Sequence, residues 1–133
     1  MKLTHHGAHE GVTGSCHQLN WGDKHGLLVD CGIFQGNEAR KQPNPEINFS
    51  LSNIESLLLT HVHIDHAGRI PYLLAAGFER PIYCSYPTAK LLPLVMEDAL
   101  KIGFTRSRKL ISKFLNQVKH LLRPVEYDSW QQI

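Results

Sequence analysis

The sequence predicts an α/β fold in which helices pack against one mixed β-sheet. Two strand-like segments joined by a short turn near the N-terminus indicate an antiparallel hairpin. An apolar run at residues 54–59 lacks polar alternation, which is typical of a strand covered on both faces. Apolar residues at three- and four-residue spacing over 106–122 predict an amphipathic helix. Strands therefore dominate the first part of the chain and helices the last.

The first half is expected to consist of strands separated by turns and loops. Asp30 ends the second hairpin strand just before Gly32, and the pattern leaves open whether it forms a turn or belongs to a site. The expected elements are a strand starting within residues 1–4, a histidine-rich polar loop at 5–10, a flexible stretch of small residues at 11–15, hairpin strands at 15–21 and 27–29 around a turn at 22–26, a helical turn at 36–41, a loop broken by Pro43 and Pro45, and the buried strand at 54–59.

The second half is expected to consist mainly of helices. Gly77 ends a short helix over residues 68–76, and residues 81–85 form another strand. Thr88 is the candidate N-cap of a helix that extends to about residue 102, with Pro93 placed to kink it or delay its start. The last helix covers residues 106–122 and ends at the Arg-Pro pair that follows.

A dense group of metal-binding residue types follows the buried strand directly. His61, His63, Asp65 and His66 place three of the nine histidines and one carboxylate within six positions. Imidazole and carboxylate are the ligands that borderline divalent metals prefer, zinc above all. An extended backbone points His61 and His63 to one side, whereas the adjacent Asp65 and His66 can turn toward a second point. The spacing predicts two ligand pairs for two neighbouring metals; a polar surface loop is the alternative.

Length and composition indicate one globular domain or a piece of one. The chain has 133 residues, of which 42% are hydrophobic and 20% charged, so it can bury a core and is not expected to be disordered. It has no apolar run long enough to span a membrane and no signal peptide, so a cytoplasmic location is expected. Cys16, Cys31 and Cys84 form no CxxC pair, which favours reduced, buried thiols.

Positive charge gathers in the last quarter of the chain. Residues 1–100 carry 7 Lys and Arg against 10 Asp and Glu, whereas residues 101–133 carry 7 against 2. Such a segment can attract a polyanion such as nucleic acid, although a solvated basic helix face is the more ordinary explanation. The candidate nucleic-acid-binding residues are Arg108, Lys109, Lys113 and Lys119.

The histidine cluster resembles the HxHxDH signature of the metallo-β-lactamase superfamily at every ligand position. Its flanks are similar to the β-CASP branch of that superfamily, which contains RNA- and DNA-processing nucleases. These flanking segments are GVTGSCH at residues 11–17, LVDCGIFQG at 28–36 and AGRIPYL at 67–73. The resemblance implies half of an αββα sandwich for residues 1–133, as the N-terminal part of a metallo-β-lactamase-like domain.

The resemblance also implies roles for individual residues. His61 and His63 match the ligands of one zinc ion, and Asp65 and His66 match the ligands of the other. Asp30 matches an aspartate that supports the metal loop, so Asp65 and Asp30 are the candidate catalytic residues. In this family two Zn²⁺ ions share a water molecule and hydrolyse a phosphodiester, so RNA is the implied substrate.

The chain departs from the family pattern beyond its metal motif. The family needs further histidines and a bridging aspartate, and neither His120 nor the later Asp98 and Asp128 stand in a matching context. Each metal would then have two protein ligands, whereas a catalytic zinc takes about three. We therefore expect partial or no zinc occupancy and little activity in these 133 residues alone.

Two other functions stay open at this stage. One is a hydrolase of the same superfamily that acts on a small ester or thioester, because the HxHxDH signature does not separate substrates. The other is a non-catalytic paralogue that binds RNA or a protein through its basic helix. Apolar surface left open by a missing half-domain would also allow self-association, including a homodimer.

Overall fold

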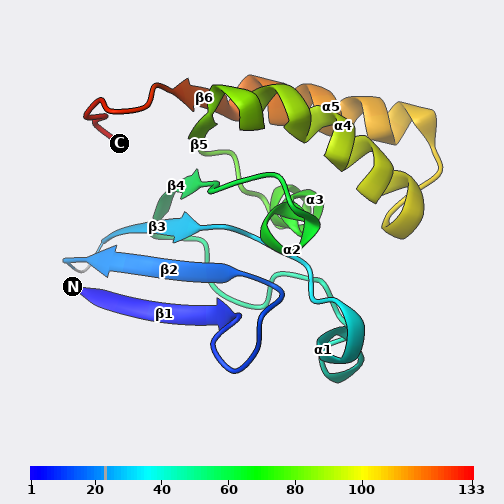
Figure 1. Cartoon of the computed structure of the whole chain (residues 1–133), viewed down its shortest axis with the longest axis horizontal. Helices are drawn as coiled ribbons and strands as arrows, with labels where there is room; N and C mark the ends of the chain where they lie inside the picture. Colours follow the sequence, from blue (N-terminus) through cyan, green and yellow to red (C-terminus); the bar gives the residue numbers. More distant parts are fainter. Residues whose placement is uncertain (23) are drawn as a thin grey trace.

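One mixed six-stranded sheet organises the molecule (Figure 1). The computed structural model describes residues 1–22 and 24–133, so the turn predicted at 22–26 lies partly outside the described residues. The strands stand side by side in chain order, with β1–β3 antiparallel and β3–β6 parallel. They are β1 (Lys2–Gly7), β2 (Cys16–Trp21), β3 (His25–Val29), β4 (Ile54–Leu58), β5 (Ile82–Ser85) and β6 (Leu122–Val125).

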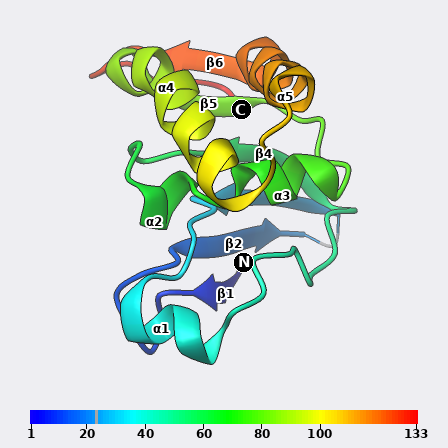
Figure 2. The same cartoon turned by 90° about the vertical axis from the view of Figure 1, so that its right-hand side faces the viewer.

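The helices between the parallel strands gather on one face of this sheet (Figure 2). Right-handed crossovers that always advance to the next strand in the same direction leave their helices on the same side. This arrangement confirms the predicted mixed sheet with helices packed on it. The helices are α1 (Gly36–Lys41), α2 (Ile64–Ala67), α3 (Ile70–Ala75), α4 (Tyr86–Gly103) and α5 (Arg108–Leu121).

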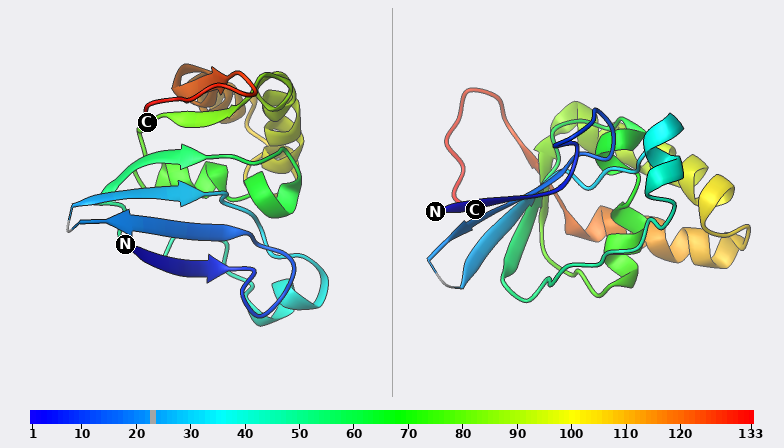
Figure 3. Two further views of the ribbon diagram at one scale, coloured as in Figure 1. Left: turned by 60° about the vertical axis from the view of Figure 1, so that its left-hand side comes forward. Right: turned by 90° about the horizontal axis from the view of Figure 1, so that it is seen from below.

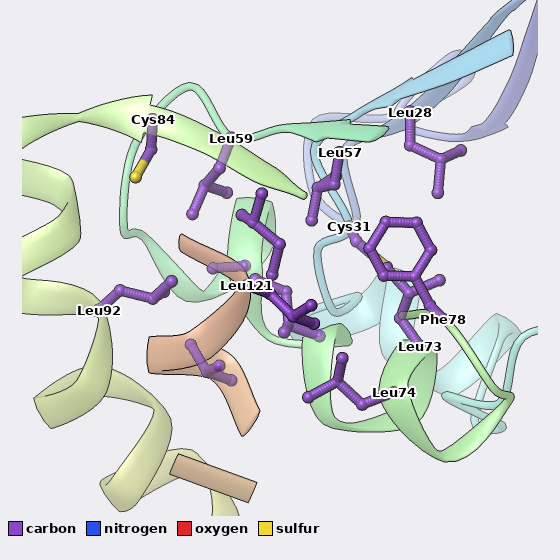
Figure 4. Packing of buried hydrophobic residues seen from close by; sticks show 14 of the residues in the cluster. Leu28, Cys31, Leu57, Leu59, Leu73, Leu74, Phe78, Cys84, Leu92 and Leu121 are labelled. Carbon is purple, nitrogen blue, oxygen red and sulfur yellow. The ribbon is translucent and has the colours of Figure 1, made fainter. Parts of the chain in front are cut away.

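The core lies between the sheet and α2–α5. Leu28 and Leu57 are paired across β3 and β4, and Leu57 is paired in turn with Ile82 on β5, so the three side chains share the helix-facing side. All three are fully buried, and they face leucines of α3, α4 and α5 (Figure 4). Cys84 belongs to the same cluster, and burial raises the pKa of its thiol to about 11, so it stays protonated at neutral pH.

The opposite face of the sheet is also apolar but is less enclosed. Leu19 is paired with Leu27, and Val29 with Leu58, and all four side chains are half-buried. Over β4–β6 this face is partly covered by the C-terminal tail, which lies on the side away from the helices (Figure 3). Within the described ranges, no helix has the length and apolar character needed to cross a bilayer.

Two predicted helix starts need correction. The cap of α4 is Ser85 rather than Thr88, because the Ser85 hydroxyl accepts a hydrogen bond from the Thr88 backbone N–H at 3.4 Å. The helix therefore begins at Tyr86, and Pro93 lies inside it without delaying its start. The helix predicted over residues 68–76 is α3, which begins two residues later at Ile70, and the separate short helix α2 precedes it.

Two strand predictions also need correction. His5 and His6 belong to β1 and not to a polar loop, because pairing with β2 satisfies their backbone while their side chains alternate between the two faces. Residues 122–125 form β6, where the sequence predicts only a helix end. Pro124 is tolerated there because β6 is an edge strand that pairs only with β5.

Candidate metal centre

The histidine cluster lies where the parallel strands β3 and β4 end. Ligand sites of layered α/β folds form beyond these carboxyl ends, because the chain leaves each strand into a loop there. Residues 60–63 follow β4 without regular structure, and α2 begins at Ile64 with His63 as its N-cap residue. The parallel partner β3 ends beside them, so Asp30 is brought to the same point.

Backbone hydrogen bonds join the segment after β3 to α2. The Cys31 N–H donates to the His66 carbonyl at 2.8 Å, and the Arg69 N–H donates to the Cys31 carbonyl at 2.9 Å. Gly32 lies between these contacts, where a Cβ would stand 1.6 Å from the Asp65 carbonyl oxygen. Only a residue without a side chain fits at this distance, so Gly32 sets how closely α2 approaches the sheet.

Asp30 is the hydrogen-bond acceptor around which the site is arranged. It is 2% exposed, and its Oδ1 accepts from both the backbone N–H and the hydroxyl of Thr60, each at 2.9 Å. Its Oδ2 accepts from the Ser15 hydroxyl at 3.0 Å and from His66 Nδ1 at 2.7 Å. Asp30 also has a φ of 61°, a left-handed conformation that Asp and Asn adopt more readily than most residues. Asp30 therefore lies beside the predicted ligands and contacts one of them, His66, directly.

These contacts set which nitrogen of two histidines carries the proton. Asp30 accepts from His66 Nδ1, so His66 holds its proton there and keeps the lone pair on Nε2. The Thr60 hydroxyl donates to Asp30, so its oxygen can accept from His61 Nδ1 at 3.0 Å. His61 therefore also presents an unprotonated Nε2. Metal-binding histidines are oriented in this way by a partner on the other nitrogen.

The four predicted ligands are brought together in space. His66 Nε2 lies 3.6 Å from Asp65 Oδ2, near the roughly 3.3 Å that separates two ligand atoms of a tetrahedral zinc. The His61 ring centroid is 4.6 Å from that of His63 and 4.0 Å from that of His66. Among residues 1–22 and 24–133, however, no three His, Cys, Asp or Glu side chains form a group that could hold a metal.

The electrostatics of the cluster keep His61 available as a ligand. Burial, followed by the neighbouring His66 and His63, lowers the pKa of His61, and these effects outweigh the carboxylates of Asp30 and Asp65. A neutral imidazole is the form that binds a metal. The cluster therefore does not need to lose a proton from His61 before it binds a cation at neutral pH.

The structure adds three residues whose contacts the sequence pattern does not report. Thr60 precedes the motif but reads as part of the strand end, although its hydroxyl connects Asp30 to His61. Ser15 belongs to the small-residue stretch expected beside the site, and its contact with Asp30 confirms that location. Glu38 on α1 accepts hydrogen bonds from the backbone N–H groups of Val12 and Thr13 and from the Thr13 hydroxyl, which lowers the pKa of its carboxyl.

The basic residues proposed for nucleic acid lie apart from this cluster. All four side chains are exposed on α5, which packs against α4 near β6, whereas the histidines follow β4 in the middle of the sheet (Figure 1). The structure thus brings together the predicted metal ligands and Asp30 but not the basic helix. These exposed residues are Arg108, Lys109, Lys113 and Lys119.

Comparisons with known proteins reveal several relatives in RNA metabolism. The chain is 37% identical over 130 residues to Ribonuclease TTHA0252 of Thermus thermophilus. This alignment covers 98% of the present chain and 29% of the relative. It is 30% identical over 134 residues to Transcription termination factor FttA of Methanosarcina mazei, in an alignment that covers 96% of this chain and 21% of that protein. Integrator complex subunit 11 of Danio rerio is 32% identical over 110 residues, in an alignment that covers 77% of this chain and 18% of that protein. The chain thus spans less than a third of these relatives.

A family model and a solved structure complete the comparison. A Cronobacter sakazakii metallo-β-lactamase structure aligns with 61% of this chain and 31% of its own at a TM-score of 0.43 and 20% identity. The model of the metallo-β-lactamase superfamily matches residues 11–128, which include the histidine cluster and the segments that pack around it. The RNA-processing relatives agree with the β-CASP branch that the flanking segments predict. The chain belongs to the metallo-β-lactamase superfamily.

Proposed function

We propose that these residues form the N-terminal part of a zinc-dependent nuclease that hydrolyses RNA phosphodiesters. The observation that carries the proposal is the arrangement around Asp30, which favours a proton on Nδ1 of His61 and His66 and so leaves the lone pairs of both Nε2 atoms for a metal. The relative named as a ribonuclease shares 37% identity over nearly the whole of this chain, which favours RNA over a small ester or thioester. The basic α5 is consistent with a polyanionic substrate.

Each residue of the cluster has a distinct role in this proposal. His61 and His63 would hold one zinc ion, and Asp65 and His66 would hold the other. Bound zinc lowers the pKa of water to roughly 7 and so supplies a nucleophile at neutral pH. Asp30 orients His66 directly and His61 through Thr60, so it is a positioning residue that does not touch the reacting atoms. In this proposal the remaining ligands of each ion are supplied from outside residues 1–133.

Cleavage of single-stranded RNA by the full-length protein tests this function. We expect His63→Ala to lower RNA cleavage by at least about 100-fold, because a lost metal ligand costs no less than a lost supporting contact. His25→Ala is the matched control, since His25 is exposed on β3 and bonds only to Glu55 among the described residues. A thioester and ester panel is assayed in parallel. Hydrolysis of that panel without RNA cleavage would show that the second hydrolase class is correct.

The basic helix is tested by reversing its charge. We expect Lys109→Glu with Lys113→Glu to weaken RNA binding and to reduce the slope of log affinity against log salt by at least about 1.4, because two phosphate contacts to a single strand are lost. Lys2→Glu with Lys24→Glu changes the net charge equally at two exposed sites, one at the start of β1 and one in the turn just before β3. If both double variants weaken binding alike, α5 is not the RNA-binding surface.

A further inference from the structure

Two histidines outside the metal motif form a pair on the other face of the sheet. His5 on β1 is directly opposite His17 on β2, and His17 is in turn opposite Val29 on β3, whose side chain lies on the face away from the helices. The two Nδ1 atoms are 2.8 Å apart, and the rings meet edge to face with centroids 4.9 Å apart. His5 is exposed and His17 is half-buried, so the pair is open to solvent on one side.

The surroundings of His17 orient it as metal-binding histidines are oriented. Its Nε2 lies 3.4 Å from the Ser15 hydroxyl, whose proton goes to Asp30 Oδ2. The Ser15 oxygen can therefore accept from His17 Nε2, so the proton of His17 belongs on Nε2 and its Nδ1 keeps a lone pair directed at His5. Burial and the neighbouring His5 lower the pKa of His17, which favours its neutral form, while Asp30 opposes this effect.

His5 can present its own lone pair at the same point. In the metal-free pair His5 donates from Nδ1 to His17, but its solvent-exposed ring can move this proton to Nε2, where water accepts it. A tetrahedral cation needs a nitrogen separation of roughly 3.3 Å. The two Nδ1 atoms must therefore move apart by about half an ångström. This is a small movement for the His5 side chain, because β1 is an edge strand whose register shifts between His5 and Gly7.

We propose that His5 and His17 form a second binding site for a borderline divalent cation such as Zn²⁺, held by the two Nδ1 atoms and completed by water. This class of cation follows from the donor set, because imidazole suits Zn²⁺, Ni²⁺ and Cu²⁺ and not Mg²⁺ or Ca²⁺. The site is connected to the histidine cluster through Ser15 and Asp30 but shares no ligand with it. It does not depend on the proposed nuclease function.

A zinc titration followed by imidazole ¹⁵N NMR tests the site residue by residue. We expect the Nδ1 resonances of His5 and His17 to shift together and saturate at one Zn²⁺ per pair. His5→Ala is expected to weaken zinc binding at His17 by at least about tenfold, because one of two ligands is lost. The resonances of His61 and His66 should respond to zinc in this variant as they do in the unmodified protein, which separates the two sites.

Matched controls keep the outcome decisive. His120→Ala removes an exposed histidine on α5 and should leave the His5 and His17 response unchanged. Circular dichroism checks that His5→Ala is folded, which is expected because the residue lies on an edge strand. If millimolar Zn²⁺ leaves the His5 and His17 resonances in place while those of the cluster shift, the pair is a hydrogen bond only and the proposal is wrong. Equal zinc affinity at His17 with and without His5 would also overturn it.

Discussion

Replacing Gly32 with alanine is expected to destabilise the chain by at least about 3 kcal/mol, the upper end of ordinary overpacking costs. The new Cβ would stand 1.6 Å from the Asp65 carbonyl oxygen, 2.1 Å from its carbonyl carbon and 2.7 Å from the His66 backbone nitrogen. These are backbone atoms of α2, so no side chain can rotate away to relieve the contact. The segment after β3 must then separate from α2, which breaks the hydrogen bonds from Cys31 to His66 and from Arg69 to Cys31.

Urea unfolding of the purified chain measures this effect, with Gly103→Ala as the matched control. Gly103 ends α4, and a Cβ there meets nothing within 4 Å. Its replacement is expected to be neutral or stabilising by up to about 1 kcal/mol, because alanine favours a helix over glycine. If Gly32→Ala unfolds at the same urea concentration as the unmodified chain, the close approach between β3 and α2 is not what positions the histidine cluster.

Replacing Asp30 with asparagine is expected to lower zinc affinity at the histidine cluster by about 10- to 100-fold, the usual cost of losing a partner that orients metal ligands. Asparagine keeps the size of the side chain and tolerates the positive φ, so the change isolates the hydrogen bonding. The carboxylate accepts from Thr60, Ser15 and His66, and an amide has only one oxygen to replace two acceptors. Its NH₂ group would face a donor, which costs about 1–3 kcal/mol of stability at a buried site.

Calorimetric zinc titration and thermal melting of the full-length protein and its Asp30 variant check both expectations. Asp98→Asn is the control, because Asp98 is exposed on α4 and, among the described residues, is not one of the groups that hydrogen-bond His61, His66 or Asp30. The imidazole tautomers give a second readout, since His66 should lose its preference for a proton on Nδ1 only in the Asp30 variant. Unchanged zinc affinity together with an unchanged His66 tautomer would show that Asp30 stabilises the loop without orienting the ligands.

Most secondary-structure elements could be predicted because their patterns are local. The strand at residues 54–59 and the helix at 106–122 were recognisable from apolar runs and spacing alone, and both are present as β4 and α5. The strand predictions that are wrong concern residues whose conformation depends on a distant partner. Residues 122–125 form a strand because β5 supplies their hydrogen-bond partners. His5 and His6 belong to a strand because β2 supplies theirs. No pattern within a short window reports such pairing.

The candidate site shows the same division. The four predicted ligands lie within six consecutive positions, so their residue types and spacing were visible in the sequence. The contacts of Thr60, Ser15 and Gly32 are with residues far away in the sequence. The longest of these separations is 50 residues, between the Ser15 N–H and the Asp65 carbonyl that it bonds. A threonine, a serine and a glycine have many ordinary uses in loops, so their residue types do not disclose a role at the site.

The sequence by itself predicted the donor set and determined the mixed sheet with its helices, because ligand chemistry and hydrophobic periodicity are properties of neighbouring residues. The superfamily was recognised from the resemblance to the HxHxDH signature. Only the tertiary structure decided which nitrogens of His61 and His66 keep a lone pair, because that choice depends on Asp30 reaching across from the end of β3. It also placed His5 opposite His17, because two residues 12 apart meet only when β1 and β2 pair in this register.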